Sequence, residues 1–311
     1  MNREKSEVIS ILAKRLNKTV VKYWQYYLLI LPALISILVF HYIPIYGVQI
    51  AFKNFVPSKG IWGSPWVGLK HFQRFFNGYY FGRLLSNTLL IGLYQLALFP
   101  VSIILALSMN EVGNLRYKKV VQTVTYAPHF ISTVVIVSMV MCFFQTNGIF
   151  GQLVELLGGT RMNYMGEAKY FKSIYVLSGK WQDMGWGAII YLGALSGVDL
   201  SLHEAAQIDG ASRIQRIIHI NLPAIAPTVT LMMILQLGSV MSVGYEKIYL
   251  MQNPLNMSAS DVISTYVYRV GLADAQYSFS SAVGLFNSLI NLILLCSANF
   301  FAGRLTGNSL W

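Results

Sequence analysis

The chain has 311 residues, of which 55% are apolar and only 11% are charged, and its mean hydropathy is +0.53. A soluble domain carries about 25% charged residues, so the composition excludes an ordinary soluble protein, and its many apolar and aromatic residues exclude a disordered chain. The net charge of +11 arises from short basic clusters between apolar runs, a pattern typical of lipid-headgroup contacts rather than of a nucleic-acid-binding face. We therefore expect a polytopic membrane protein.

The amino-terminal region is a basic tail followed at once by an apolar run. The tail, residues 1–23, is either solvated or a short helix on the membrane surface. Its basic residues nearest the run are Lys14, Arg15, Lys18 and Lys22. The run, residues 24–50, is too long for the core of a signal peptide and predicts an uncleaved membrane anchor.

Five further apolar runs have about the 20 residues needed to cross a bilayer. They cover residues 84–109, 121–145, 171–196, 224–245 and 280–303. The sequence thus predicts an all-α membrane protein with six transmembrane helices in residues 24–303, followed by a short tail, residues 304–311. An even number of spans places both termini on one side of the membrane, and the basic residues before the first span favour the cytoplasm.

The segment between the fourth and fifth runs, residues 199–223, carries the signals of two short helices. The pair Ser201 and Glu204 has the spacing of a capping box, which predicts a helix that starts just after the serine. The Asp209–Gly210 pair should end this helix, because glycine adopts the left-handed conformation found at helix ends. Ser212 can cap a second helix, and Pro223 suits the first turn of the fifth span. We expect a helix–turn–helix that projects from the membrane.

This segment resembles the EAA loop of ABC-importer permeases, Glu-Ala-Ala-x-x-Asp-Gly-Ala followed after a fixed gap by Ile-x-Leu-Pro-x-x-x-Pro. The matching residues are Glu204, Ala205, Ala206, Asp209, Gly210, Ala211, Ile220, Leu222, Pro223 and Pro227. One departure is Ile217, where sugar-importer versions usually carry an aromatic residue. Residues 59–72 and 127–135 look like the sugar-importer branch near the maltose-type permeases, which is associated with complex or acidic oligosaccharides.

The resemblance implies the type I ABC importer permease fold, with both termini and the EAA loop in the cytoplasm of a bacterial cell. The loop would dock on an ATPase subunit, with Glu204 pairing with a basic group there. The implied coupling residues are Glu204, Ala205, Ala206, Asp209, Gly210, Ala211, Leu222 and Pro223. The implied partners are a second homologous permease in a heterodimeric pore, an ATPase dimer, an extracellular solute-binding protein, an oligosaccharide and the lipids of the plasma membrane.

The sequence offers no nucleotide or metal site of its own. The Gly179–Lys180 pair has Ile174 where the first glycine of a Walker A string belongs and Trp181 where Ser or Thr belongs. The five histidines lack metal-ligand spacing, and Cys142 and Cys296 lie inside apolar runs. We expect a chain that is not an enzyme and binds no cofactor, with ATP and Mg bound by the partner ATPase.

Three other readings compete with a saccharide importer. An amino-acid or peptide importer of the same superfamily would share the EAA loop. A self-sufficient secondary transporter or channel fits six spans but would not need that loop. An intramembrane protease would need a GxSxG-like or HExxH string within a span, and residues 193–197 have the wrong spacing.

Polar residues at membrane depth indicate the substrate path, because each destabilises the buried span unless it serves a function. The candidates are Gln182, Asp183 and Trp186 in span four, Gln236, Ser239 and Val243 on one expected face of span five, and Asn287 in span six. Asn291 lies one turn beyond, and both asparagines are equally suited to hydrogen bonds between helices. Because Asp183 is a carboxylate on this path, we expect a largely neutral saccharide held by the span-four residues.

Overall fold

The computed structural model describes residues 22–311, so most of the predicted basic tail lies outside the described residues. In the described part, all regular secondary structure is helical except for one isolated antiparallel bridge, between Lys53 and Trp66. It divides after Gly68 into two compact units, which are described separately.

The first unit contains the first predicted span, as one helical stretch over Lys22–Phe52. The stretch includes the π turn η1 (Leu38–Tyr42), the short helix α2 (Ile43–Ile45) and the 3₁₀ helix η2 (Tyr46–Phe52). Pro44 explains the wide turn, because proline lacks an N–H and its ring clashes with the carbonyl four residues earlier in a regular α-helix. No residue of its most apolar stretch is buried, so this surface is open to lipid or another chain.

The loop after this span is tied down by polar contacts within the first unit. It contains η3 (Pro57–Lys59) and α3 (Gly60–Gly63). Lys53 is buried, donates from Nζ to the Ile61 carbonyl at 2.7 Å and lies over the ring of Trp66. The Ser64 hydroxyl accepts from the Val56 N–H at 3.0 Å.

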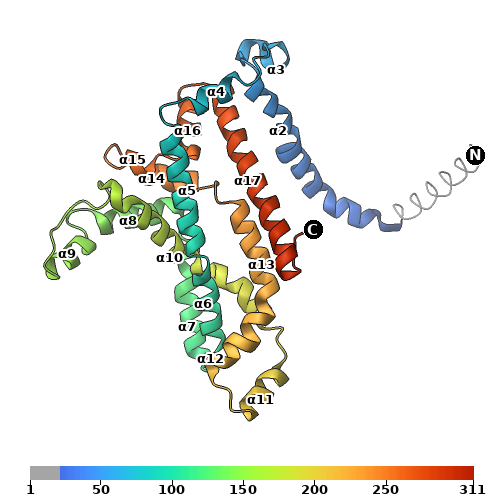
Figure 1. Cartoon of the computed structure of the whole chain (residues 1–311), viewed down its shortest axis with the longest axis vertical. Helices are drawn as coiled ribbons and strands as arrows, with labels where there is room; N and C mark the ends of the chain where they lie inside the picture. Colours follow the sequence, from blue (N-terminus) through green and yellow to red (C-terminus); the bar gives the residue numbers. More distant parts are fainter. Residues whose placement is uncertain (1–21) are drawn as a thin grey trace, which may run out of the picture. The chain divides into compact units, whose positions relative to one another are not determined.

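The second unit is a bundle of long helices with short helices at both ends (Figure 1). The elements before the 199–223 segment are α4 (Lys70–Phe76), α5 (Phe81–Ala97), α6 (Pro100–Asn110), α7 (Leu115–Tyr126), η4 (Ala127–Phe130), α8 (Thr133–Phe144), α9 (Ile149–Leu156) and α10 (Ala168–Leu195). Those that follow are α11 (Leu200–Ile208), α12 (Arg213–Arg216), η5 (Ile217–Asn221), α13 (Leu222–Gly238), α14 (Tyr245–Met251), α15 (Met257–Ser260), α16 (Ile263–Tyr268), η6 (Arg269–Ala273) and α17 (Tyr277–Thr306).

The helices are consistent with the six predicted spans. Within residues 22–311, five are long and apolar enough to cross a membrane: Lys22–Phe52, Phe81–Asn110, Thr133–Leu156, Arg213–Gly238 and Tyr277–Thr306. The sixth candidate is α10 together with α11, two helices that meet at an angle of 80°. The all-α membrane fold expected from the sequence is thereby confirmed.

The third and fifth runs differ from their predicted bounds. The third run, predicted as one helix over residues 121–145, is interrupted by η4 and resumes at Thr133, with the Ser132 hydroxyl as cap. Pro128 lies in this interruption, where its missing N–H breaks the helical ladder. The fifth run, predicted to reach residue 245, ends at Gly238 and begins further upstream, at Arg213.

Close helix crossings hold the bundle together. Helix α10 packs against α6, α7 and α13, and α13 packs against α17. At two close contacts only glycine fits. A Cβ on Gly185 of α10 would lie 2.1 Å from the Thr125 carbonyl oxygen of α7, and one on Gly92 of α5 would lie 2.1 Å from the carbonyl oxygen of Val240, in the turn after α13. Small residues allow this approach because transmembrane helices associate mainly through close packing.

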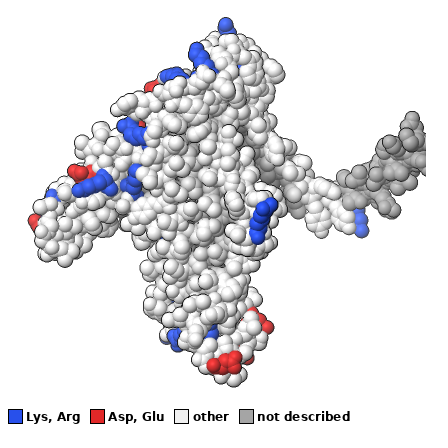
Figure 2. Space-filling view, viewed as in Figure 1, with Lys and Arg blue, Asp and Glu red and all other residues white. Residues whose placement is uncertain are grey.

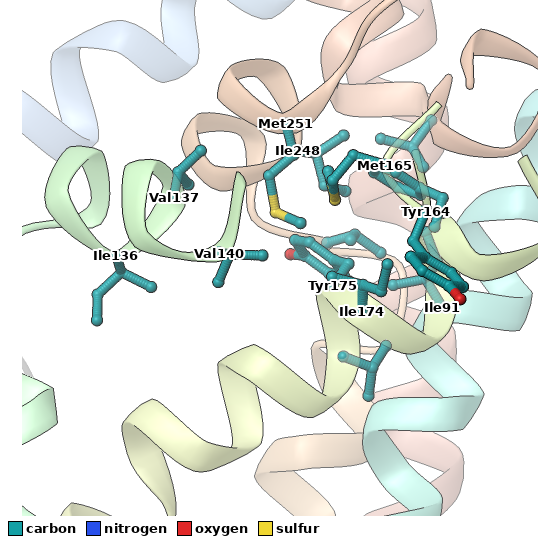
Figure 3. Packing of buried hydrophobic residues seen from close by; sticks show 14 residues of the cluster. Ile91, Ile136, Val137, Val140, Tyr164, Met165, Ile174, Tyr175, Ile248 and Met251 are labelled. Carbon is teal, nitrogen blue, oxygen red and sulfur yellow. The ribbon is translucent and has the colours of Figure 1, made fainter. Parts of the chain in front are cut away.

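The largest buried cluster lies where α8, α10 and α14 meet (Figure 3). Ile136, Val137 and Val140 reach it from α8, and Ile248 and Met251 reach it from α14. Helix α10 adds four further members, Phe171, Ile174, Tyr175 and Val176. This cluster fixes α14 against α10 and so positions the polar residues described below.

Candidate functional site

Helix α11 of the 199–223 segment begins earlier than the capping-box spacing predicted. The actual N-cap is Asp199, whose carboxylate accepts from the Ser201 N–H at 2.9 Å, so Ser201 lies inside the helix rather than at its start. This backbone hydrogen bond lowers the pKa of the Asp199 carboxyl below its ordinary value. Aspartate competes well for this position because it caps as effectively as serine and its charge suits a helix N-terminus. The predicted pairing of Ser201 with Glu204 is therefore wrong.

The end of α11 confirms the predicted turn. Gly210 has a φ of +76°, in the left-handed region. The Ala211 N–H donates to the Ala206 carbonyl at 2.8 Å, and the Gly210 N–H donates to the Gln207 carbonyl at 3.1 Å. These two bonds form a Schellman motif, which satisfies the last carbonyls of the helix.

The second helix of the 199–223 segment starts as predicted but does not end before the fifth span. The Ser212 hydroxyl accepts from the Gln215 N–H, and the Gln215 side chain accepts from the Ser212 N–H at 2.7 Å, which is a complete capping box. Helix α12 then continues through the π turn η5 into α13. Pro223 lies in the first turn of α13, as predicted, although this helix continues from α12 without a break. The preceding π turn provides the space that the proline ring needs.

The tip formed by α11 presents an unpaired carboxylate among exposed apolar side chains. Glu204 is exposed and forms no ion pair or side-chain hydrogen bond with any described residue. Leu200, Ile208 and Ile214 nearby are 74%, 87% and 69% exposed. Acidic side chains gather at this tip (Figure 2). Exposed apolar residues around a charged group are typical of a surface that another protein covers.

The 199–223 segment is anchored to the second span by groups that sequence reasoning missed. Asn221, fully buried in the π turn, donates from Nδ2 to a carboxylate oxygen of Glu111 at 3.2 Å. Arg216 lies 3.8 Å from the other oxygen of the same carboxylate. Glu111 is the C-cap of α6, so this cluster ties η5 to the C-terminal end of that helix.

The three predicted substrate-path residues of α10 all face the η4 interruption. The Asp183 carboxylate lies 2.9 Å from Nδ1 of His129. The His129 ring stacks on Trp186 with 4.5 Å between the ring centroids. Gln182 donates to the Ile131 carbonyl at 3.2 Å, so its amide supports the broken backbone of the third run. His129 was not predicted, because nothing in its spacing connects it to residues more than fifty positions away.

Asp183 and Gln236 line one cavity of about 210 Å³, together with two groups that the sequence analysis did not select. These are Gln95 of α5 and Lys180 of α10. Lys180 also donates from Nζ to the Ser102 hydroxyl at 3.1 Å. The cavity thus combines one carboxylate, one ammonium group and two amides.

A second lysine reaches the wall of this cavity. The Nζ of Lys247, on α14, is buried without a hydrogen-bond partner and lies 5.6 Å from the centroid of the Tyr175 ring. A Cβ on Gly179, which lines the cavity, would lie 3.4 Å from this Nζ. A buried ammonium group without a partner is unfavourable unless it serves a ligand.

The other predicted path residues lie elsewhere. Because α13 ends at Gly238, Ser239 and Val243 do not share a helical face with Gln236. Val243 is 3% exposed and belongs to the apolar cluster of Figure 3, while the Ser239 hydroxyl donates to the Gln236 carbonyl. The predicted shared face is therefore wrong, because the helix ends at Gly238 within an apolar run, while the assignment of Ser239 and Val243 to the substrate path stays a prediction.

The two asparagines of α17 differ in their contacts. Asn291 accepts from the Met241 N–H at 3.0 Å and donates to the Ser242 hydroxyl at 2.8 Å, so it supports the break after α13. The Oδ1 of Asn287 is buried without a hydrogen-bond partner, which leaves its assignment to the path as a prediction.

Comparisons with known proteins connect these features to a transport system. The family described as "Binding-protein-dependent transport system inner membrane component" matches residues 98–307. Protein LplB of Bacillus subtilis is 43% identical over 280 residues, covering 89% of this chain and 88% of that protein. The polygalacturonan/rhamnogalacturonan transport system permease protein YteP of the same organism is 42% identical over 293 residues, covering 94% of this chain and 91% of that one.

Solved structures agree with this similarity along nearly the whole chain. A chain of a bacterial ABC transporter involved in the import of the acidic polysaccharide alginate has a TM-score of 0.86 and 37% identity, over 94% of this chain and 99% of that one. A second structure is of a bacterial alginate ABC transporter in complex with an alginate pentasaccharide-bound periplasmic protein. It also has a TM-score of 0.86, with 36% identity over 95% of this chain and all of that one.

Proposed function

The chain belongs to the family of binding-protein-dependent transport system inner membrane components, and we propose that the cargo it passes across the membrane is an acidic oligosaccharide. It is the permease subunit of a sugar ABC importer and does not itself catalyse ATP hydrolysis. Relatives named for polygalacturonan, rhamnogalacturonan and alginate import support a cargo built from sugar acids.

The observation that carries this proposal is the pair of lysines at the cavity around Asp183. Lys180 lines the cavity and Lys247 reaches its wall with a buried, unpartnered ammonium group. A neutral cargo was expected from the sequence because Asp183 is a carboxylate on the path. In the structure this carboxylate lies beside His129 and shares the cavity with Lys180. Ammonium groups at membrane depth attract carboxylates, and a dry environment strengthens this attraction.

The assembly we propose follows from the exposed tip of α11. Glu204, Ala205, Asp209 and Gly210 are exposed there, as expected of a segment that docks on an ATPase dimer carrying ATP and Mg. A second permease would complete the pore, and an extracellular solute-binding protein would deliver the saccharide. In this arrangement the 199–223 segment and both termini lie in the cytoplasm. An amino-acid or peptide importer is less favoured, because YteP is named for polygalacturonan/rhamnogalacturonan transport and the solved structures for alginate import.

Replacing Lys247 with Gln tests the cargo. We expect uptake of trigalacturonate by the complete importer in proteoliposomes to fall by about 10- to 100-fold, because a hydrogen bond to a charged group contributes about 1.5–3 kcal/mol. Uptake of the fully methyl-esterified, neutral trisaccharide should change little. Lys169→Gln, an exposed lysine at the start of the same α10, is the matched control. Equal loss of both substrates would make Lys247 a structural residue, and unchanged uptake of both would remove it from the path.

A further inference from the structure

A second polar pocket, of about 480 Å³, lies in the second unit. Two of the helices that line it, α4 and α16, lie at the end of this unit away from α11 (Figure 1). Its walls come from α4, α5, α16 and η6, and we call it the arginine pocket. Its chemically distinctive residues are Arg74, Arg83, Arg269, Tyr79, Tyr80 and Tyr266. It shares no lining residue with the cavity around Asp183.

The arginine pocket has more cationic than anionic groups. Asp261 is fully buried and holds two of the arginines: Arg269 donates to its carboxylate at 2.9 and 3.2 Å, and Arg83 lies 3.5 Å away. Arg74 forms no ion pair with any described residue and lies over the ring of Phe279. Asp274 also lines the pocket, so three guanidinium groups face two carboxylates.

Two buried polar atoms of the arginine pocket lack hydrogen-bond partners. They are Nε of Arg83, a donor, and Oε1 of Gln276, an acceptor. Leaving such groups unpaired is unfavourable, so their presence in one pocket indicates a ligand that both accepts and donates hydrogen bonds. A sugar acid does both, because its carboxylate accepts and its hydroxyls donate.

The tyrosines add flat surfaces of the kind that sugar rings contact. Cζ of Arg83 lies 4.8 Å from the centroid of the Tyr80 ring, and Cζ of Arg269 lies 5.5 Å from that of the Tyr266 ring. Tyr79 also lines the pocket and is 91% exposed. Arginine is suited to carboxylates because its planar group forms two parallel hydrogen bonds with them.

We propose that the arginine pocket binds one sugar-acid residue of the oligosaccharide before it enters the cavity around Asp183. This proposal rests on the proposed function, since it requires an acidic cargo that arrives from the side opposite the 199–223 segment. The pocket would hold the anionic chain at the entrance through Arg74, whose guanidinium group is not engaged by a carboxylate of this chain, and through Nε of Arg83.

The direct test is protection of Arg74 from phenylglyoxal, a reagent that modifies arginine, with the importer in lipid nanodiscs and mass spectrometry as the readout. Trigalacturonate at a few times its dissociation constant should slow the modification of Arg74 by at least about threefold, by simple mass action. The methyl-esterified trisaccharide should not protect it, and the exposed Arg304 of α17 should be modified at the same rate throughout. Absence of protection by trigalacturonate would overturn the proposal.

Two further arms separate other occupants and the parent hypothesis. If only the unloaded solute-binding protein protects Arg74, or if inorganic phosphate protects it as well as trigalacturonate does, the pocket is not a sugar-acid site. Arg74→Gln should raise the KM for trigalacturonate uptake severalfold and leave kcat unchanged, with Lys70→Gln on the same helix as control. If the wild-type importer takes up no trigalacturonate, the proposed function fails. If wild-type uptake is normal and Arg74→Gln matches it, only the arginine pocket fails.

Discussion

Replacing Glu204 with Lys is expected to abolish transport while leaving the chain folded and inserted in the membrane. The side chain is exposed on α11 and has no partner among the described residues, so the fold does not depend on it. In the assembly that we propose, the new ammonium group would face a basic group of the ATPase, which is the expected partner of the Glu204 carboxylate. Loss of one member of such a desolvated pair costs about 2–5 kcal/mol, which weakens docking by at least about 30-fold. Copurification of the ATPase and uptake by proteoliposomes measure the two effects.

Two control variants define how this result is interpreted. Glu204→Gln removes the charge without reversing it and should give a smaller defect in the same direction. Glu167 is exposed at the N-cap of α10, the end of that helix away from α11. The variant Glu167→Lys makes the same charge reversal there and should transport normally. Normal transport by Glu204→Lys would remove the 199–223 segment from the coupling mechanism.

Single cysteines at Ser58 and Gln207 are expected to react on opposite sides of the membrane. Both residues are exposed in the structure, and Gln207 is preferable to Ser212, whose hydroxyl is needed as a helix cap. Cys142 and Cys296 are exposed as well and should first be replaced by Ser. A membrane-impermeant maleimide added to intact cells should label the cysteine at 58 and leave that at 207 unlabelled until the cells are opened. The reverse pattern would mean that the orientation is inverted.

The sequence was sufficient to predict which segments are membrane-spanning helices and approximately where they lie, because segments of about 20 apolar residues have few alternatives to a helix in a bilayer. The predicted helix bounds were less reliable where a single proline or glycine interrupts or ends a helix. Pro128 interrupts the third run inside an apolar string, and Gly238 ends the fifth where hydropathy continues. The first cap was misassigned because Asp199 and Ser201 are both good N-cap residues, and their spacing does not decide between them.

The candidate site was predicted only in part, for a related reason. Asp183, Gln182 and Trp186 were found because polar groups at membrane depth are conspicuous in one apolar helix. Their partners His129, Lys247 and Gln95 lie on other elements, and only the packing of those elements brings them together. Lys247 follows the predicted end of span five, so its position looked like part of an ordinary connecting loop.

Uptake of labelled trigalacturonate into proteoliposomes tests the central claim most directly. The vesicles would contain this chain, its partner permease and the ATPase, with ATP enclosed and the loaded solute-binding protein outside. Our account predicts uptake that requires the enclosed ATP, the ATPase and the binding protein, and that stops when any one of them is omitted. Uptake that continues without the ATPase would contradict an ATP-driven importer and would instead indicate a self-sufficient transporter.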